Sequence, residues 1–395
     1  MKQRKNRLNA GEGLGTLAAS LVCILAGLLL GFIVLLILAW VSALQTAGSG
    51  ERVTFAMVLS NTWNAGFRQL LQGGFYMMPI GLGKEIATAA PLIMTGLSVG
   101  FAFKTGLFNI GAAGQYTVGA FGALLCAIVL KLPWWACLIG ATLFGAIWGA
   151  IPGLFKAYLN INEVITAIMF NWIGLYGVNT IMYGGGSGVM YDSSKTKTWV
   201  LRNLYPDSVI PDFGLGNLFK TRSVTIAIFM AIVVAIIIYV VIRRTTFGYE
   251  LRACGLNKDA AKYAGINEKR SIVLSMLISG ALAGFGAGLY YLSGVGEWSP
   301  MDSTALPGIG FDGISVALLG ASNPIGIIFS ALFISHLTTG GGFMSANIFP
   351  PEVASVITAI IIYLCAFSLL FKNQLMKLFQ RRKAPSAKTK EVQKK

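Results

Sequence analysis

The segment RRTTFGYELRACGLNKDAAKYAGINEKR, residues 243–270, lies between two long apolar stretches, residues 223–242 and 271–293. Each stretch has about the 20 residues that an α-helix needs to cross a bilayer. A helix satisfies its backbone hydrogen bonds internally, as the membrane interior requires. The segment between them is charged and contains helix-favouring runs. We therefore expect a soluble, partly helical insertion between two membrane spans, exposed for docking to a cytosolic partner.

The whole chain has the composition of a membrane protein. Of its 395 residues, 55% are hydrophobic and only 12% are charged, with a mean hydropathy of +0.70. Globular proteins carry roughly 25% charged residues. The sequence predicts an all-α, polytopic membrane helix bundle of about ten spans, at 17–40, 84–104, 107–130, 134–158, 162–183, 223–242, 271–293, 308–321, 324–341 and 353–371.

Two regions do not fit simple spans. Segment 308–321 is too short to cross alone, so we expect a half-helix or a re-entrant piece there. Residues 52–80 could form an amphipathic helix along the outer surface. Glycines spaced by four in 140–153 and 280–288 predict closely packed helices.

The distribution of basic residues predicts the orientation. With both termini cytoplasmic, 22 of the 31 Lys and Arg residues lie on the inner side, as the positive-inside rule favours. The predicted parts are a basic N-terminus (1–16), a transmembrane domain (17–371) with an outer loop (184–222) and the inner loop (243–270), and a basic tail (372–395). The net charge of +16 is then matched by anionic membrane lipids, and no nucleic-acid partner is needed.

Several chemistries lack their sequence signatures. The five cysteines show no disulfide framework and no Cys/His spacing for a metal. A phosphate-binding GxxxxGK[ST] loop is absent, so the chain cannot hydrolyse ATP by that route. We expect a multi-pass protein of the cell membrane that is not itself an enzyme and holds no cofactor or metal.

Polar residues inside apolar segments are candidates for a substrate path, because such residues in a membrane are costly and are usually functional or paired. Glu163 could contact substrate, or it could cap its helix and pair with Lys156 at the inner interface. The other candidates could contact substrate or form hydrogen bonds between helices. They are Asn109, Gln115, Asn171 and Asp312. A loose internal similarity between residues 106–125 and 308–333 places Asn109 and Asp312 at equivalent positions.

The inner loop carries local helix signals. Residues 249–253 and 259–264 favour helix, residues 257–259 are a plausible N-cap region, and Gly265 is a plausible C-cap. Ala260, Ala261 and Ala264 would form a small apolar face that could insert into a groove on another protein. The alternative is a solvated basic loop, which explains the charge but not the alanines.

This loop resembles the coupling segment of permease subunits of ATP-binding cassette importers for simple sugars, nucleosides and branched-chain amino acids. The matching positions are Phe247, Gly248, Arg252, Ala253, Gly255, Asn257, Ala260, Ala261, Ala264, Gly265 and Ile266. SMLISGALAGFGAG (275–288) is similar to the helix that follows in that family. GLFNIGAAGQYTVGAF (106–121), NEVI (162–165) and FDGISVALLGASNPIG (311–326) resemble its nucleoside branch. The resemblance covers about residues 85–370.

The resemblance implies a nucleoside permease of a bacterial cytoplasmic membrane, with pentoses or hexoses as the alternative substrates. Its implied partners are a cytosolic ATPase that binds ATP and Mg²⁺, a second permease that is often a different chain, and an extracytoplasmic substrate-binding protein or lipoprotein. The coupling residues that it implies are Arg252, Gly255, Asn257, Asp259, Ala260, Ala261, Ala264 and Gly265. The implied path residues are Asn109, Gln115, Glu163, Asn171 and Asp312.

Two other classes of function remain open from the residues alone. An ion-coupled carrier could use Glu163 and Asp312 as proton sites and would need no ATPase. An intramembrane protease could use Ser187 and His336, although His336 has no Cys, Asp or Glu close to it in sequence and is readily explained as a packing residue.

Overall fold

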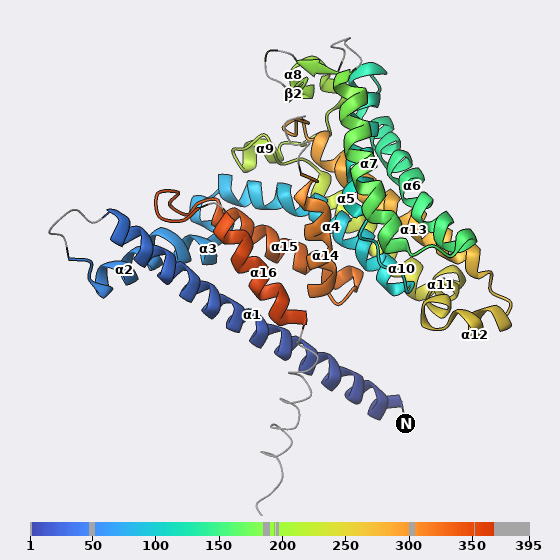
Figure 1. Cartoon of the computed structure of the whole chain (residues 1–395), viewed down its shortest axis with the longest axis horizontal. Helices are drawn as coiled ribbons and strands as arrows, with labels where there is room; N and C mark the ends of the chain where they lie inside the picture. The colour runs from blue at the N-terminus through green and yellow to red at the C-terminus, as the bar shows by residue number, and fades with distance from the viewer. Residues whose placement is uncertain are drawn as a thin grey trace, which may run out of the picture. The chain divides into compact units, whose positions relative to one another are not determined.

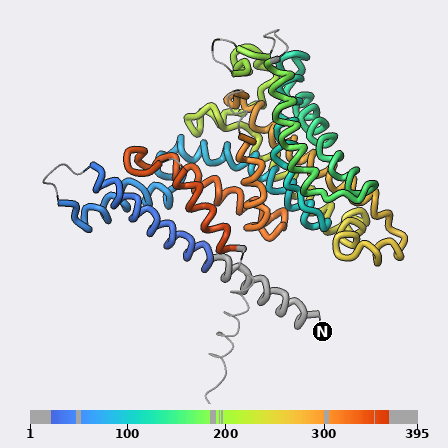
Figure 2. Tube along the Cα trace, in the orientation of Figure 1, coloured from blue at the N-terminus to red at the C-terminus, as the bar shows by residue number. Residues whose placement is uncertain are grey.

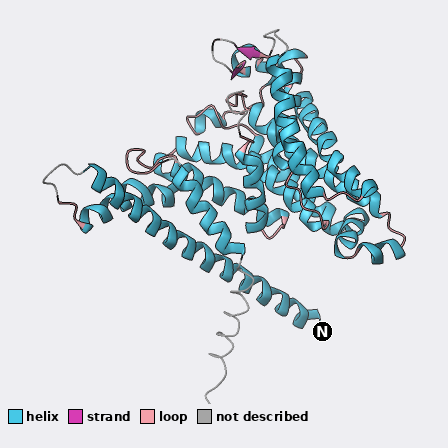
Figure 3. Cartoon of the chain, viewed as in Figure 1, coloured by secondary structure: helices cyan, strands magenta, loops and turns pink. Residues whose placement is uncertain are grey.

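The computed structural model describes residues 2–46, 52–184, 190–192, 194, 197–299, 305–350 and 352–366. Most of this part of the chain is helical, as the cyan ribbon in Figure 3 shows. Strands β1 (Tyr191–Asp192) and β2 (Lys197–Thr198) pair antiparallel as a two-residue ribbon. The prediction of an all-α membrane bundle is confirmed.

Ten apolar helices among the described residues match the ten predicted spans. Eight are long and apolar enough to cross a membrane, and two are shorter. The longer ones are α1 (Lys2–Thr46), α4 (Ile80–Lys104), α5 (Ala112–Leu124, extended by a π turn to Val129), α6 (Trp134–Leu159), α7 (Glu163–Gly184), α10 (Ala227–Arg244), α13 (Glu268–Tyr291) and α15 (Pro324–Gly341). The shorter ones are α14 (Gly308–Leu319) and α16 (Glu352–Ala366). The remaining helices are α2 (Phe55–Thr62), α3 (Arg68–Gln72), α8 (Leu201–Leu204), α9 (Leu215–Leu218), α11 (Thr246–Leu256) and α12 (Lys258–Tyr263).

The predicted half-helix is present as α14. Its 12 residues extend for about 18 Å at 1.5 Å per residue, which is well short of a hydrocarbon core of about 30 Å. A tight turn with left-handed backbone at Ala321 and Ser322 then leads into α15. Asn323 caps α15 by accepting a hydrogen bond from the Ile325 N–H at 3.2 Å, and Pro324 occupies the first helical position, where its missing N–H costs nothing.

Residues 52–80 do not form the single amphipathic helix that was considered for them. They are divided into α2, a π turn (Trp63–Phe67), α3 and a 3₁₀ turn (Gly73–Met77). Gly73 has a φ of +50°, a left-handed conformation that interrupts a right-handed helix. Helix α13 begins at Glu268, three residues before the predicted start, because the Asn267 side chain caps it by accepting the Arg270 N–H.

The contacts divide the chain into two compact units, residues 1–68 with 344–395, and residues 69–343. In the first unit α1 and α16 lie side by side, as Figure 2 shows. A Cβ atom on Gly27 would lie 2.6 Å from Cγ1 of Ile361, and one on Gly31 would lie 2.7 Å from Cγ2 of Ile357. Glycine therefore permits the close approach of these two helices.

Helix α4 is at the centre of the second unit, where it packs against α13, α14, α15 and α10 (Figure 1). Every residue from Ala89 to Ala102 is buried. Helices α6 and α13 cross with their glycines in contact, as the glycine spacing predicts. A Cβ atom on Gly145 would lie 2.5 Å from the carbonyl oxygen of Gly280. The crossing therefore depends on the absence of side chains.

The outer loop, residues 184–222, is held against the end of α13. Trp298 is buried, its N–H donates to Thr198 Oγ1 at 2.9 Å, and its indole Nε1 donates to Asn179 Oδ1 at 2.8 Å. One nitrogen of Arg202, Nη2, donates to the carbonyl oxygens of Arg222 and Ser293. These bonds tie β2 and α8 to the end of α13 and to the chain that follows it.

Candidate functional site

The soluble insertion at the end of α10 consists of α11 and α12. Asn257 separates them, and its Oδ1 accepts a hydrogen bond from the Ala260 N–H at 3.0 Å, so Asn257 is the N-cap of α12. Gly265 has a φ of +82°, and the N–H groups of Gly265 and Ile266 both donate back to carbonyls of α12. This is a Schellman C-cap. The two predicted helical stretches and both predicted caps are confirmed.

The exposed face of α12 differs from the predicted alanine face. Ala260 and Ala264 are exposed, but Ala261 is only 3% exposed and packs within its own chain. The largest exposed apolar side chains are Leu256 at 89% and Tyr263 at 94%. The prediction that all three alanines form one docking face is therefore wrong, because packing against the rest of the chain covers Ala261 and leaves Ala260 and Ala264 exposed. Two large apolar residues within a charged loop were the signal that could have identified Leu256 and Tyr263.

Gly255 brings α11 into backbone contact with the end of α4. A Cβ atom on Gly255 would lie 2.6 Å from the carbonyl carbon of Thr105 and 2.7 Å from the nitrogen of Gly106. Gly106 itself has a φ of +76°. The nearby Arg252 donates from Nε to the Gly248 carbonyl at 3.2 Å, within its own helix. The insertion is thus in direct contact with the turn that joins α4 to α5.

Three of the predicted path residues fix this same turn. Asn109 and Gln115 form a reciprocal amide pair, with Nδ2 to Oε1 at 2.8 Å and Nε2 to Oδ1 at 3.0 Å. Asn109 Nδ2 also donates to Ser98 Oγ on α4 at 3.0 Å. Asn171 on α7 accepts from the Gly114 N–H at 2.8 Å and donates to the Ile110 carbonyl at 3.0 Å.

These three amides are at most 2% exposed, and their hydrogen bonds are made within this chain. The sequence left two roles open for these amides, contact with substrate and hydrogen bonding between helices, and the observed hydrogen bonds correspond to the second. The Asn109–Gln115 pair joins the turn to α4, and Asn171 joins it to α7. Asn109 lies before the start of α5, whereas Asp312 lies inside α14. The internal similarity therefore does not place these two residues equivalently.

Glu163 lies in the first turn of α7 and forms an ion pair with Lys156 at the end of α6, with 2.9 Å between Oε2 and Nζ. The side chains are 14% and 18% exposed. The turn between the helices contains Asn160 in a left-handed conformation, and Asn162 Oδ1 accepts the Val164 N–H. Of the two roles left open for Glu163, substrate contact and a cap or pairing near Lys156, the ion pair corresponds to the second.

Asp312 is exposed on α14, on the face that points away from α4 and α5. The opposite face is closely packed, since a Cβ on Gly313 would lie 2.7 Å from the carbonyl carbon of Thr95. Phe311 and Leu318 are exposed beside Asp312. Within the described part of the chain, the Asp312 carboxylate makes no hydrogen bond or ion pair. Of the five predicted path residues it is the one whose side chain is available.

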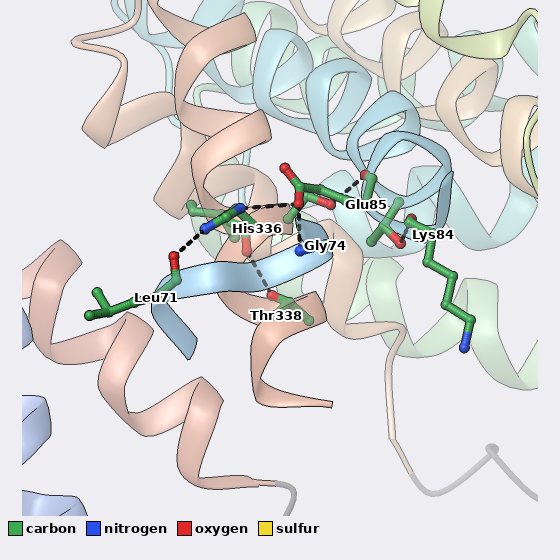
Figure 4. Close-up of polar contacts among 9 residues, drawn as sticks. Leu71, Gly74, Lys84, Glu85, His336 and Thr338 are labelled. Atoms are coloured by element: carbon green, nitrogen blue, oxygen red, sulfur yellow. Dashed lines mark hydrogen bonds and ion pairs between the residues drawn. The ribbon is translucent and has the colours of Figure 1, made fainter. Parts of the chain in front are cut away.

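His336 has a partner that its sequence neighbourhood does not show. Its Nδ1 lies 3.0 Å from Oε2 of Glu85, near the start of α4, and its Nε2 lies 3.0 Å from the Leu71 carbonyl (Figure 4). The Gly74 N–H also donates to Glu85 Oε2, at 2.9 Å. Both acceptors around the ring suit an imidazole with a proton on each nitrogen. The arrangement binds α15, α4 and the 3₁₀ turn together, and sequence reasoning missed Glu85.

Ser187 lies outside the described residues, and His336 is engaged with Glu85. Across the described ranges, no group of three His, Cys, Asp or Glu side chains comes together that could hold a metal ion.

Comparison with known proteins gives consistent matches. The sequence pattern of the family described as "branched-chain amino acid transport system / permease component" matches residues 83–366. The nucleoside ABC transporter permease protein NupB of Lactococcus lactis is 36% identical over 75% of this chain and 82% of its own. The guanosine ABC transporter permease protein NupP of Bacillus subtilis is 34% identical over 92% and 97%. A glucose ABC transporter permease of Haloferax volcanii is 30% identical over 74% and 78%. No solved structure matches the chain.

Proposed function

Because this chain belongs to the family of branched-chain amino acid transport system permease components, we propose that it forms the membrane path of an ATP-binding cassette importer and that its substrates are nucleosides. Two relatives that cover most of the chain carry nucleoside or guanosine in their names. The glucose permease of Haloferax volcanii is less similar, at 30% identity, so simple sugars are the second candidate.

The coupling role is supported by the exposed apolar surface formed by the last residue of α11 and by α12. Leu256, the last residue of α11, and Tyr263, the last residue of the doubly capped α12, expose two large apolar side chains outside the membrane spans. Apolar side chains projecting from a helix are the usual anchors for a groove on another protein. We assign this surface, Leu256, Ala260, Tyr263 and Ala264, to the cytosolic ATPase, which binds ATP and Mg²⁺.

The backbone contact of Gly255 explains how movement of this surface would reach the spans. Displacing α11 displaces the turn after α4, because the two backbones touch and leave no room for independent motion. Asn109, Gln115 and Asn171 connect that turn to α4, α5 and α7. Closure of the ATPase subunits would favour one of two helix arrangements by contacting it better.

We place the path along the exposed face of α14, where Asp312 and Ser315 offer polar groups beside Phe311. A carboxylate and a hydroxyl can bond to the hydroxyls and ring nitrogens of a nucleoside. This face belongs to one chain, so a second permease, a chain of different sequence as in the nucleoside branch, would complete the path. A substrate-binding protein outside the cell membrane would deliver the solute.

Variants of Leu256 and Tyr263 test this function in bacterial membranes. Leu256→Glu and Tyr263→Glu should each abolish co-purification of the ATPase and lower nucleoside uptake by about thirtyfold, since a central anchor at an interface is typically worth 2 kcal/mol or more. Leu218→Glu is the matched control, because Leu218 is 66% exposed on α9, at the other end of the spans.

Uptake of labelled guanosine, compared with labelled ribose and glucose, decides the substrate class. Sugar uptake without nucleoside uptake would favour the second candidate. Unchanged ATPase recovery and unchanged uptake in both glutamate variants would refute the coupling role.

A further inference from the structure

A cavity of about 390 Å³ lies at the ends of the spans opposite the coupling segment. It is bounded by the start of α4, the start of α10, the end of α13 and the end of α15. Its size is within the range of small-molecule pockets, roughly 300–1,000 Å³. Residues with hydroxyl groups or aromatic rings line it, including Thr88, Thr225, Tyr290, Thr339 and Phe343.

Among the described residues that line this cavity, Lys84 is the charged one and none is a carboxylate. Figure 4 shows the Lys84 side chain directed away from Glu85, which is engaged with His336. Among the described residues, the Lys84 ammonium has the Phe343 ring as its contact, at 5.9 Å from the ring centre, and makes no ion pair. Lys84 is exposed at the edge of this cavity, so its ammonium is available to an anion, which would supply the counter-charge that the described residues do not.

A second cavity of about 420 Å³ lies along the same two helices, α10 and α13. Its lining is apolar and includes Phe229, Val233 and Phe285. Phe285 is one helical turn closer to the middle of α13 than Leu289, which lines the first cavity. Phe229 and Val233 are more than half exposed and belong to the apolar outer face of α10. The two cavities share no lining residue, but they follow one another along the same two helices. A cationic end and an apolar outer face in this order match the headgroup and the acyl chain of an amphiphile.

We propose that this pair of cavities binds an anionic phospholipid, with its phosphate on Lys84 and the neighbouring hydroxyls and one acyl chain along Phe229, Val233 and Phe285. A phospholipid headgroup and a free phosphate ion both present a phosphate anion, which a lysine and hydroxyl groups bind through charge-assisted hydrogen bonds. The apolar cavity favours a lipid over a free phosphate. The inference does not depend on the transported solute or on the ATPase.

The test uses the full-length chain purified with whatever subunits accompany it. Native mass spectrometry, after exchange into lipid-free detergent, measures binding of phosphatidylglycerol, of phosphatidylcholine with the same acyl chains, and of inorganic phosphate. Lys84→Met removes the ammonium and keeps the stem, and Lys131→Met is the control, since Lys131 is exposed and lines neither cavity. Val233→Trp fills the apolar cavity from an exposed position.

We expect the unmodified protein to prefer phosphatidylglycerol, and Lys84→Met to weaken that binding by about tenfold or more, as for loss of a charged hydrogen bond. Val233→Trp should also weaken it, and Lys131→Met should not. Equal phosphatidylglycerol binding by the Lys84 and Lys131 variants would overturn the proposal. Displacement of the lipid by millimolar inorganic phosphate, with no effect of Val233→Trp, would overturn the lipid assignment in favour of a soluble phosphate.

Discussion

Gly255→Ala is the sharpest perturbation of the route from the coupling segment into the spans. The new methyl carbon would lie 2.6 Å from the carbonyl carbon of Thr105 and 2.7 Å from the nitrogen of Gly106. Non-bonded carbons pack at about 3.5–4.0 Å, so α11 must withdraw by roughly 1 Å. Both opposing atoms are backbone, and no side-chain rotation can relieve the contact.

The expected cost follows from this overlap. Overpacking a filled site costs about 1–3 kcal/mol, and replacing a helical glycine by alanine returns about 0.5–1 kcal/mol. The net loss of unfolding free energy should be about 1–2 kcal/mol. Loss of a similar amount, about 1–2 kcal/mol, from the coupling between this segment and the spans should lower nucleoside uptake by about five- to thirtyfold, while the ATPase still co-purifies, because Leu256 and Tyr263 remain exposed.

Two assays on purified complex and on reconstituted vesicles separate these effects, namely denaturant unfolding and ATP-driven uptake. Gly177→Ala in α7 is the matched control, because a Cβ atom there meets nothing within 4 Å. It should leave uptake unchanged and stability equal or slightly higher. Wild-type uptake and stability in Gly255→Ala would refute the reasoning that the backbone contact transmits motion.

Two further perturbations address buried polar groups. Glu85→Ala and His336→Ala should each lower the unfolding free energy by about 2–3 kcal/mol, because each removes a charge-assisted hydrogen bond and leaves the other, partly buried partner with only its backbone hydrogen bond; the double variant should lose less than the sum, and uptake per folded molecule should stay close to normal. Purely additive losses in the double-mutant cycle would show that the pair is not coupled. Asn171→Ala should lower the unfolding free energy by about 1–3 kcal/mol, because it leaves the Gly114 N–H and the Ile110 carbonyl unpaired. It should also reduce uptake while the ATPase still binds. Normal stability and normal uptake in this variant would show that Asn171 does not hold the turn in place.

Features that depend only on residues close together in the sequence could be predicted from the sequence itself. Each membrane span depends on a run of neighbouring apolar residues, so its position follows from hydropathy without knowledge of its packing partners. The caps at Asn257 and Gly265 likewise involve bonds within a few residues, and both were predicted correctly. The pairing of Glu163 with Lys156 was accessible for the same reason, since only seven positions separate them.

Features that depend on distant parts of the chain were decided by the tertiary structure. Glu85 and His336 are 251 positions apart, and nothing near either residue indicates the other. Helix periodicity placed Ala260, Ala261 and Ala264 on α12, but only packing against the chain determined that Ala261 is buried and Tyr263 is exposed. The amides of Asn109, Gln115 and Asn171 could have faced a solute or one another. Their hydrogen bonds form because the fold brings the turn after α4 against α7. The identity of the side chains does not indicate that these two elements are in contact.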